Sequence, residues 1–278
     1  MKENPRYVNL EVRPGEYVPE TGIDYPADDN MARLVPAPVV KQLSFDESYP
    51  YLDDSFSFKF QHFLAYALVF GPFFIVNSLR YGLRFEGREV LRKYRKELKG
   101  GAVSVSNHCY RWDGMAIAEA LRRHIWIPML HDHFQGPDRW YLRYFGGIPL
   151  SDGSLSATRA FNNAFDEHHR RGEWVHVFPE ARNWHFYKPV RPFQKGAFTM
   201  AYRWGVPVVP ISISYRKRKG ICRLFDKAEI PLITVRIGEP IFPDTGAPRK
   251  AEVDRLLRAT HAAVCELGGI TSNTWDAE

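Results

Sequence analysis

The chain has 278 residues, 45% of them hydrophobic, and carries a formal net charge of +6. This length allows a large buried core, and no linker, low-complexity tract or internal repeat interrupts its middle, which favours one main domain. Three cysteines make no disulfide framework, which excludes the disulfide-rich secreted class and indicates a reducing cytosolic environment. Basic clusters such as Arg216-Lys217-Arg218-Lys219 suit phosphate groups or acidic lipids, although a solvated surface is the alternative for any single cluster. No recognised nucleic-acid motif accompanies them, so no nucleic-acid partner is expected.

Residues 1–55 are predicted to form an extended arm. They are polar, and no secretory signal opens them. Prolines recur through this segment without any apolar period, which is typical of an extended chain and not of a packed domain. The prolines are Pro5, Pro14, Pro19, Pro26, Pro36, Pro38 and Pro50.

Residues 56–82 are predicted to form a hydrophobic two-helix hairpin. No Lys, Arg, Asp or Glu interrupts the 20 residues from Phe60 to Leu79, and a membrane span needs roughly 20 apolar residues. Gly71-Pro72 lies in the middle, and proline breaks a helix, so two short helices lying in one leaflet fit better than one straight span. A buried hairpin in a soluble core is the alternative. The segment predicts a peripheral or monotopic protein at the cytoplasmic face of a membrane, with an anionic membrane surface as a partner.

Strands and helices alternate through residues 83–278. This order predicts an α/β fold with a mixed, largely parallel sheet flanked by helices. Sites in such sheets gather at the carboxyl ends of strands, and His108 and Glu180 fall at two such ends. The expected strands are residues 102–106, 125–130, 148–150, 174–179, 206–214 and 232–238, and the expected helices are residues 113–123, 157–169, 196–204 and 250–267.

A histidine and an aspartate flank the turn between the first of these strands and its helix. His108 and Asp113 are five residues apart, and neither a straight helix nor a strand would let their side chains touch, whereas a turn would. A carboxylate can hold an imidazole in one tautomer and stabilise the imidazolium as it forms. His108 is therefore predicted to act as general base on a substrate hydroxyl, oriented by Asp113.

Other interpretations of this pair stay open. Asp113 alone suits a helix-capping position. Cys109 invites a thiol-nucleophile mechanism, which is discounted because adjacent side chains usually diverge. His131 and His133 could join His108 in a metal-dependent hydrolase, although no second set with ligand spacing is visible, and no metal is expected.

Four sequence blocks in order resemble the glycerolipid acyltransferase superfamily, whose best-known members are the 1-acylglycerol-3-phosphate acyltransferases. The resemblance covers about residues 57–240 and makes residues 83–278 an acyltransferase domain. Lys195 and Gly196 precede the fourth block, as is usual in the family. The blocks are Asn107–Asp113, which resembles the Asn-His-x4-Asp catalytic block, Phe145–Leu150, Phe178–Arg182 and Val206–Pro210.

The resemblance implies direct transfer of a fatty acyl group from an acyl thioester, carried by coenzyme A or acyl carrier protein, to a hydroxyl of a lysophospholipid. No bound cofactor is required. His108 and Asp113 would be catalytic, and Asn107, Lys195 and Gly196 would support the loop. An inactive lipid-binding protein of the same fold is the alternative. Glu180, Arg182, Arg111 and Arg159 would bind the acceptor.

The chain departs from the family pattern where the acceptor phosphate is expected to bind. Ser151-Asp152-Gly153 offers no arginine after the second block. In the third block Ala181 replaces a glycine, and Asn183 replaces the customary arginine. These departures predict that phosphate recognition is rebuilt from other arginines, with Arg182 the nearest substitute, or that the acceptor carries a substituted headgroup.

Overall fold

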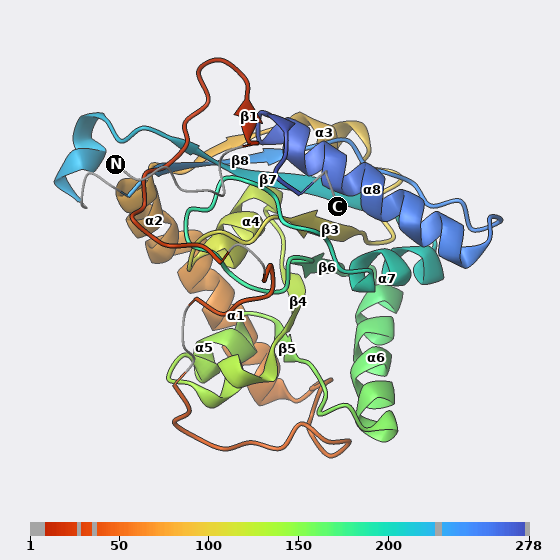
Figure 1. Ribbon diagram of the computed structural model, residues 1–278. Coiled ribbons are helices and arrows are strands. Elements are labelled where there is room, and N and C mark those ends of the chain that lie inside the picture. The colour runs from red at the N-terminus through yellow and green to blue at the C-terminus, as the bar shows by residue number, and fades with distance from the viewer. Residues whose placement is uncertain (1–8, 27–28, 35–37, 226–229, 276–278) are drawn as a thin grey trace.

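The structure is a computed structural model that describes residues 9–26, 29–34, 38–225 and 230–275. Its centre is a seven-stranded sheet with the strand order β2-β8-β7-β3-β6-β4-β5 (Figure 1). The β7–β8 pair is antiparallel, and every other neighbouring pair is parallel, which confirms the predicted mixed, largely parallel sheet. The strands are β2 (Arg84–Glu86), β3 (Val103–Ser106), β4 (Ile125–Met129), β5 (Gly147–Pro149), β6 (Trp174–Val177), β7 (Val208–Arg216) and β8 (Leu232–Ile237).

Helices cover both faces of the sheet and bury two main clusters of apolar side chains. One face packs α4 against β7 and β8, and the other packs α7 and α8 against β3 and β7 (Figure 1). A third cluster joins α1 (Phe56–Leu68) and α6 to β4 and β6. The helices of the domain are α3 (Arg88–Lys93), α4 (Asp113–Leu121), η3 (His131–Gln135), α5 (Arg139–Tyr144), α6 (Leu155–Arg170), α7 (Gly196–Trp204), η4 (Gly220–Leu224) and α8 (Arg249–Leu267).

The glycine-rich second block is explained by a close approach of two strands. Gly146 has φ of 106°, and a Cβ atom there would lie 2.3 Å from the carbonyl oxygen of Ile125. Only glycine fits both the positive φ and the contact. Gly146 therefore lets β5 begin directly beside β4, and β4 together with Phe145 and Leu150, which flank β5, lines the cavity described below.

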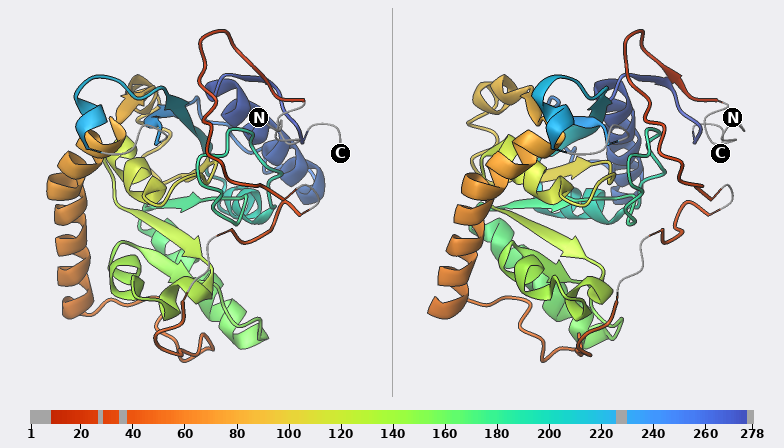
Figure 2. Two further views of the ribbon diagram at one scale, coloured as in Figure 1. Left: turned by 60° about the vertical axis from the view of Figure 1, so that its left-hand side comes forward. Right: turned by 90° about the vertical axis from the view of Figure 1, so that its left-hand side faces the viewer.

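The apolar segment consists of two helices that meet at a kink at Gly71, as predicted, but they do not fold back on each other, so the predicted hairpin is wrong. Helices α1 (Phe56–Leu68), η2 (Val69–Phe73) and α2 (Phe74–Tyr81) follow one another without reversing direction (Figure 2). Pro72 removes one backbone donor, but a wide π-helical turn with non-helical angles at Gly71 absorbs the break. By length and composition, Phe56–Tyr81 could cross a membrane, and only 22% of its most apolar stretch is buried in the protein.

The N-terminal arm has little regular structure but is not detached from the domain. Its strand β1 (Glu11–Val12) pairs with β9 (Ile270–Ser272), which follows α8. Tyr25, Phe45 and Tyr51 are buried. The described part of the arm contributes side chains to the core, whereas the sequence predicted an arm that does not pack.

Candidate active site

His108 and Asp113 touch across the turn between β3 and α4. His108 Nδ1 lies 2.5 Å from Asp113 Oδ2, which confirms the predicted contact. The backbone N–H groups of Cys109 and Gly114 also donate to the Asp113 carboxylate, at 3.2 and 2.8 Å. Asp113 is the first residue of α4, where the helix dipole favours negative charge. An ionised Asp113 thus holds the Nδ1–H proton and leaves His108 Nε2 with a lone pair.

The imidazole of His108 is stacked on a ring from the end of β6. The centroids of His108 and Phe178 are 4.2 Å apart, with 23° between the planes. Behind Phe178, the buried His176 is held at both ring nitrogens by Ser104 Oγ and Ser106 Oγ. Burial first, and then the nearby His108, lower the pKa of His176 to about 3. His176 is therefore neutral and gives Phe178 a fixed support.

Asn183 contacts the same pair from the loop after β6. Its Nδ2 lies 2.9 Å from the carbonyl oxygen of Tyr110, 3.5 Å from Asp113 Oδ2 and 3.2 Å from His108 Nδ1. Because Nδ1 already gives its proton to Asp113, the amide protons of Asn183 go to the carbonyl and the carboxylate. The residue that replaces the family's customary arginine thus holds the His–Asp pair in place.

Glu180 is buried and joins two loops by hydrogen bonds. Its carboxylate accepts from the N–H of His108 at 3.1 Å, from the N–H of Arg191 at 3.0 Å and from the Arg191 guanidinium at 2.9 Å. The side chains of Glu180 and Arg191 are 3% and 1% exposed. Such a buried pair holds the loop after β6 against the loop after β3. This geometry favours a positioning role for Glu180 over the predicted contact with the acceptor.

The N-terminal arm covers the loop that Glu180 begins. Tyr25 stacks on Trp184 at 5.7 Å and packs against Tyr187 at 4.7 Å. The indole N–H of Trp184 donates to the carbonyl of Ala32 at 2.9 Å, and its backbone N–H donates to the carbonyl of His108 at 3.1 Å. The arm, the loop and the catalytic turn therefore form one packed unit.

A cavity of about 820 Å³ opens beside His108 and Asp113. Asn183 and Phe178 also line it, and His108 keeps 22% of its side chain exposed there. Apolar side chains form most of its remaining wall, which suits a hydrocarbon chain. They include Ile127, Met129, Leu130, Leu142, Phe145, Phe161, Val177 and Met200.

The structure places the other predicted site residues at different distances from this cavity. Arg111, Lys195 and Gly196 line it; Arg111 pairs with Asp138 at 2.7 Å and Lys195 with Asp254 at 2.6 Å. Asn107 does not line it. Its amide exchanges two hydrogen bonds, at 2.8 and 2.9 Å, with the backbone of Ile213, which joins the end of β3 to β7.

The two remaining arginines do not line the cavity. Arg159 is exposed on α6. Arg182 does not line the cavity itself, but it lies between Ala181 and Asn183 in the chain, and both of these residues line it. Its Nε is buried and has no hydrogen-bond partner among the described residues. Arg182 is thus a cation with an unused donor, next in the chain to Asn183, which contacts the His–Asp pair.

The thiol and metal alternatives find little support. Cys109 is 2% exposed, and burial first, then the Asp113 charge, raise the pKa of its thiol. A reactive thiol needs the opposite shift. His133 lines the cavity with His108, whereas His131 pairs with Asp132 at 3.0 Å. Within the described ranges, no group of three or more His, Cys, Asp or Glu residues could hold a metal ion.

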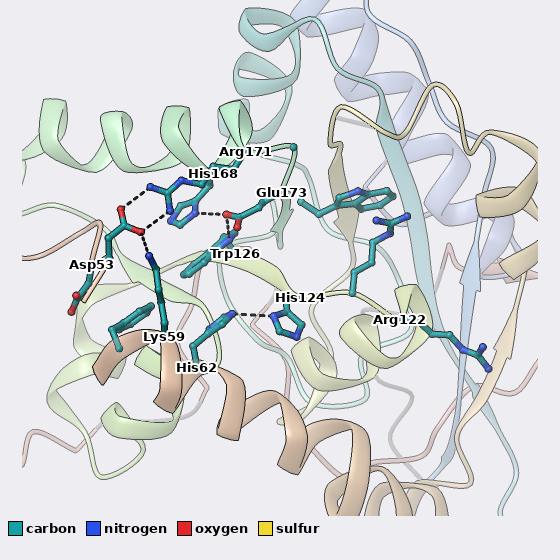
Figure 3. Close-up of a pocket in the computed structure, with 14 residues that line it drawn as sticks. Asp53, Lys59, His62, Arg122, His124, Trp126, His168, Arg171 and Glu173 are labelled. Atoms are coloured by element: carbon teal, nitrogen blue, oxygen red, sulfur yellow. Dashed lines mark hydrogen bonds and ion pairs between the residues drawn. The ribbon is translucent and has the colours of Figure 1, made fainter. Parts of the chain in front are cut away.

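A second cavity, of about 420 Å³, lies at the opposite ends of β4 and β6, beside the start of α1 (Figure 3). It gathers three histidines around a tryptophan. His62 stacks on one side of Trp126 at 5.0 Å and His168 on the other at 3.7 Å, and His62 Nε2 lies 3.2 Å from His124 Nδ1. Burial first, and then His124, lower the pKa of His62 to about 4.

Comparison with known proteins identifies the family. The protein-family model described as Acyltransferase matches residues 82–214, which contain the His–Asp turn, the cavity wall and the loop after β6. The human protein 1-acyl-sn-glycerol-3-phosphate acyltransferase beta is 31% identical over 193 residues, which span 66% of this chain. Both matches support the glycerolipid acyltransferase superfamily as the family of this chain.

Two further facts define how far these similarities extend. The match spans 64% of the length of the human acyltransferase. The crystal structure of the 1-acyl-sn-glycerophosphate acyltransferase PlsC from Thermotoga maritima is similar with a TM-score of 0.47 and 21% sequence identity, covering 77% of this chain and 84% of that one.

Sequence reasoning about this acyltransferase-family chain missed Arg191 and the arm's Tyr25. Arg191 lies 11 residues after Glu180 in a loop without periodicity, so no local pattern links the two. Tyr25 belongs to a segment whose composition indicates an unpacked chain. The roles of both depend on tertiary contacts alone. The sequence showed Asn183 only as a departure from the family pattern. Its position directly after the third block was the one available signal that it contacts the site.

Proposed function

We propose that the chain transfers a fatty acyl group from an acyl thioester to a hydroxyl of a lysophospholipid in phospholipid biosynthesis. The observation that carries the proposal is the hydrogen-bonded His108–Asp113 pair in the wall of an 820 Å³, largely apolar cavity. The human relative's name specifies 1-acyl-sn-glycerol-3-phosphate, and that acceptor is the one we favour.

The chemistry follows from the geometry of the pair. The acceptor hydroxyl gives its proton to His108 Nε2 as its oxygen attacks the thioester carbonyl, and Asp113 stabilises the imidazolium. The tetrahedral intermediate collapses by breaking its C–S bond. The imidazolium then returns the proton to the leaving thiolate, so that an ester and a free thiol result and His108 is again neutral. No group of the protein needs to be acylated.

The cavity is suited to both substrates near one point. Its apolar wall accommodates an acyl chain, and Phe178 and Asn183 fix the His108 side. Coenzyme A or acyl carrier protein would deliver the thioester. Arg182 is the cation we assign to the acceptor phosphate, because its buried Nε lacks a partner among the described residues and guanidinium–phosphate hydrogen bonds are charge-assisted.

The bent helix Phe56–Tyr81 would hold the enzyme on the cytoplasmic face of a membrane as a monotopic protein. Phe58, Tyr66, Val69 and Tyr81 are buried against the domain along its whole length, while Phe60, Phe63, Ile75 and Val76 on other sides are exposed. A helix with the charged domain lying alongside it fits a position in the plane of the interface better than a span.

The helix also lies close to the cavity, which supports delivery of lipid from that side. Tyr66 stacks on Phe145 at 5.1 Å, and Phe73 packs edge-on against Tyr141 at 6.3 Å. Phe145 and Tyr141 both line the cavity. One layer of aromatic side chains therefore separates the exposed apolar helix from the site of reaction.

The test is to offer the purified full chain in detergent a panel of lysolipids with labelled acyl-coenzyme A or acyl carrier protein. We expect transfer to lysophosphatidate above all other acceptors. Binding of lysolipid without turnover of any donor would favour the inactive lipid-binding alternative. Release of free fatty acid, with no lipid product, would favour a hydrolase.

A further inference from the structure

The basic run at residues 216–219 divides into an inward and an outward pair. Arg218 is 4% exposed, and its guanidinium donates to the carbonyls of Arg80 at 2.5 Å and Ile230 at 2.7 Å. The Arg216 guanidinium donates to the carbonyl of Gly82. Both arginines thus bind the carboxyl end of α2, where cations are favoured. The alternating residues, Lys217 and Lys219, are exposed.

The segment that follows presents apolar side chains to the outside. In η4 and the next residue, Ile221 is 64% exposed, Leu224 81% and Phe225 46%. Arg223 is exposed among them. We call residues 217–225 the β7–β8 tip. A nine-residue segment that exposes three large apolar residues and three cations is poorly suited to remain in water.

The β7–β8 tip lies beside the apolar helix. η4 packs against α2, and both occupy the same margin of the molecule in Figure 1 and in the left panel of Figure 2. The helix that the tip contacts also exposes apolar side chains, Ile75 and Val76. Arg216 and Arg218 join the start of the tip to the end of α2 by hydrogen bonds.

We propose that the β7–β8 tip is a second membrane contact, which inserts Ile221, Leu224 and Phe225 into the interface of an anionic bilayer while Lys217, Lys219 and Arg223 lie at its headgroups. The charge decides the occupant: apolar residues ringed by cations suit acidic lipids. The inference rests on the proposed function, in which the apolar helix already lies on the membrane. A second contact beside the end of α2 fixes the rotation of the domain about that helix.

The experiment places an environment-sensitive fluorophore at one cysteine at a time in the full chain bearing Cys222→Ser. The sites are Leu224→Cys in the tip, Phe63→Cys in α1 and Leu155→Cys at the start of α6, a control with 67% exposure. Vesicles of phosphatidylcholine and phosphatidylglycerol carry bromine on their acyl chains as quencher. We expect strong quenching at positions 224 and 63 and none at 155.

The outcomes separate this inference from the function on which it rests. Quenching at 63 without quenching at 224 overturns the second contact and leaves the helix on the membrane. Quenching at neither overturns the membrane proposal itself. A fluorescence shift at 224 that rises with protein concentration without vesicles would mean that a second copy of the chain covers the tip, which also overturns the inference.

The charges of the β7–β8 tip have a matched control in the same chain. Each cation near an anionic surface contributes about fivefold to partitioning, so Lys217→Gln with Lys219→Gln should lower binding to anionic vesicles by about 25-fold. Lys96→Gln with Lys99→Gln, two exposed lysines after α3, should change it less than threefold. Equal losses for the two pairs would mean that overall charge, and not the tip, governs binding.

Discussion

The two ends of the sheet each carry a histidine hydrogen-bonded through Nδ1 to a carboxylate five residues further on. At the carboxyl ends, His108 lies 2.5 Å from Asp113; at the amino ends, His168 lies 2.7 Å from Glu173 (Figure 3). The two His–carboxylate pairs therefore have the same spacing in the sequence and the same type of hydrogen bond. The surroundings differ, and they determine which pair can do chemistry.

The side chain of His168 is buried, whereas that of His108 is exposed to a cavity. It is 2% exposed, Trp126 covers its ring at 3.7 Å, and its Nε2 has no partner among the described residues. His108 presents Nε2 beside a cavity almost twice as large, with apolar walls. A His–carboxylate pair becomes a general base only where a hydroxyl can reach its free nitrogen.

The largest effect should come from the open pair. His108→Ala removes the general base, so kcat should fall by about 10²- to 10⁴-fold while the thermal unfolding profile stays near that of the wild type. Asp113→Asn should lose a large part of the same factor, because an amide cannot accept the Nδ1 proton as a carboxylate does. Turnover of labelled acyl-coenzyme A measures both.

Activity within a few-fold of the wild type in His108→Ala would refute the mechanism. Cys109→Ala serves as the neighbouring control. Its buried thiol takes no part in the proposed reaction, so this variant should keep kcat within about threefold, which is well below a general-base effect.

The enclosed pair should matter for stability and not for activity. His168→Ala leaves a cavity beside Trp126 and removes a hydrogen bond to Glu173, which together should cost about 2–4 kcal/mol of unfolding free energy. The kcat of the folded protein should change less than threefold. A loss of kcat comparable to that of His108→Ala, with stability unchanged, would assign catalysis to the wrong end of the sheet.

The same variant should change the pH dependence of stability. Burial tends to raise the pKa of Glu173, but the hydrogen bond and charge of His168, followed by the hydrogen bond of Trp126 and the charge of Arg171, together hold the pKa below the usual 4.5. Ionised Glu173 thus stabilises the fold above about pH 4.5, and this contribution is lost as the pH falls through the lowered pKa. In His168→Ala, unfolding free energy should fall less steeply in that acid range.

Substitutions of Arg182 test whether the loop after β6 binds the phosphate of the acceptor. If its guanidinium binds the phosphate, Arg182→Ala should raise the KM for the lysolipid about tenfold, the cost of one charge-assisted hydrogen bond, and leave the KM for the acyl thioester unchanged. Arg182→Lys should recover only part, since lysine lacks the planar fork. Arg159→Ala, on exposed α6, is the control and should change neither constant.

Asn183 should have a different kinetic signature. Replacing it with leucine removes the hydrogen bonds to Tyr110 and Asp113 but keeps the volume. We expect kcat to fall about three- to tenfold with both KM values nearly unchanged, because a hydrogen bond that only positions the pair contributes about 1 kcal/mol. A raised KM for the lysolipid alone would make Asn183 a direct ligand of the acceptor.

Sequence alone could predict the parts of this site that follow from local pattern. The apolar run of β3, the turn and the start of α4 predicted that His108 and Asp113 touch, because a chain that reverses there brings them together. The alternation of elements predicted the parallel sheet and its site-bearing edge. The catalytic role of the pair stays a prediction.

The rest depends on contacts between distant segments. Composition indicated an unpacked arm, but Tyr25 is buried because Trp184 and Tyr187, some 160 residues away, offer an aromatic surface. Gly71-Pro72 predicted that the chain reverses direction, yet the helix continues past the proline through a π-helical turn. Deleting residues 1–80 would therefore remove part of the active-site support, and membrane attachment is better tested by surface substitutions.

The smallest effect concerns the strain stored at the carboxyl end of β6. Ala181 replaces the family's usual glycine and has φ of 60°, in the left-handed region. That conformation costs an L-residue about 1–2 kcal/mol, whereas glycine adopts it freely but loses about 0.5–1 kcal/mol of chain entropy. Ala181→Gly should thus raise the unfolding free energy by about 0.5 kcal/mol and change kcat little.

Ala160→Gly in α6 is the matched control, since the same substitution inside a helix should destabilise by about 0.5–1 kcal/mol. Chemical unfolding in detergent measures both variants. Effects of opposite sign would locate the strain at Ala181, and destabilisation of equal size in both would show that the loop tolerates alanine without cost.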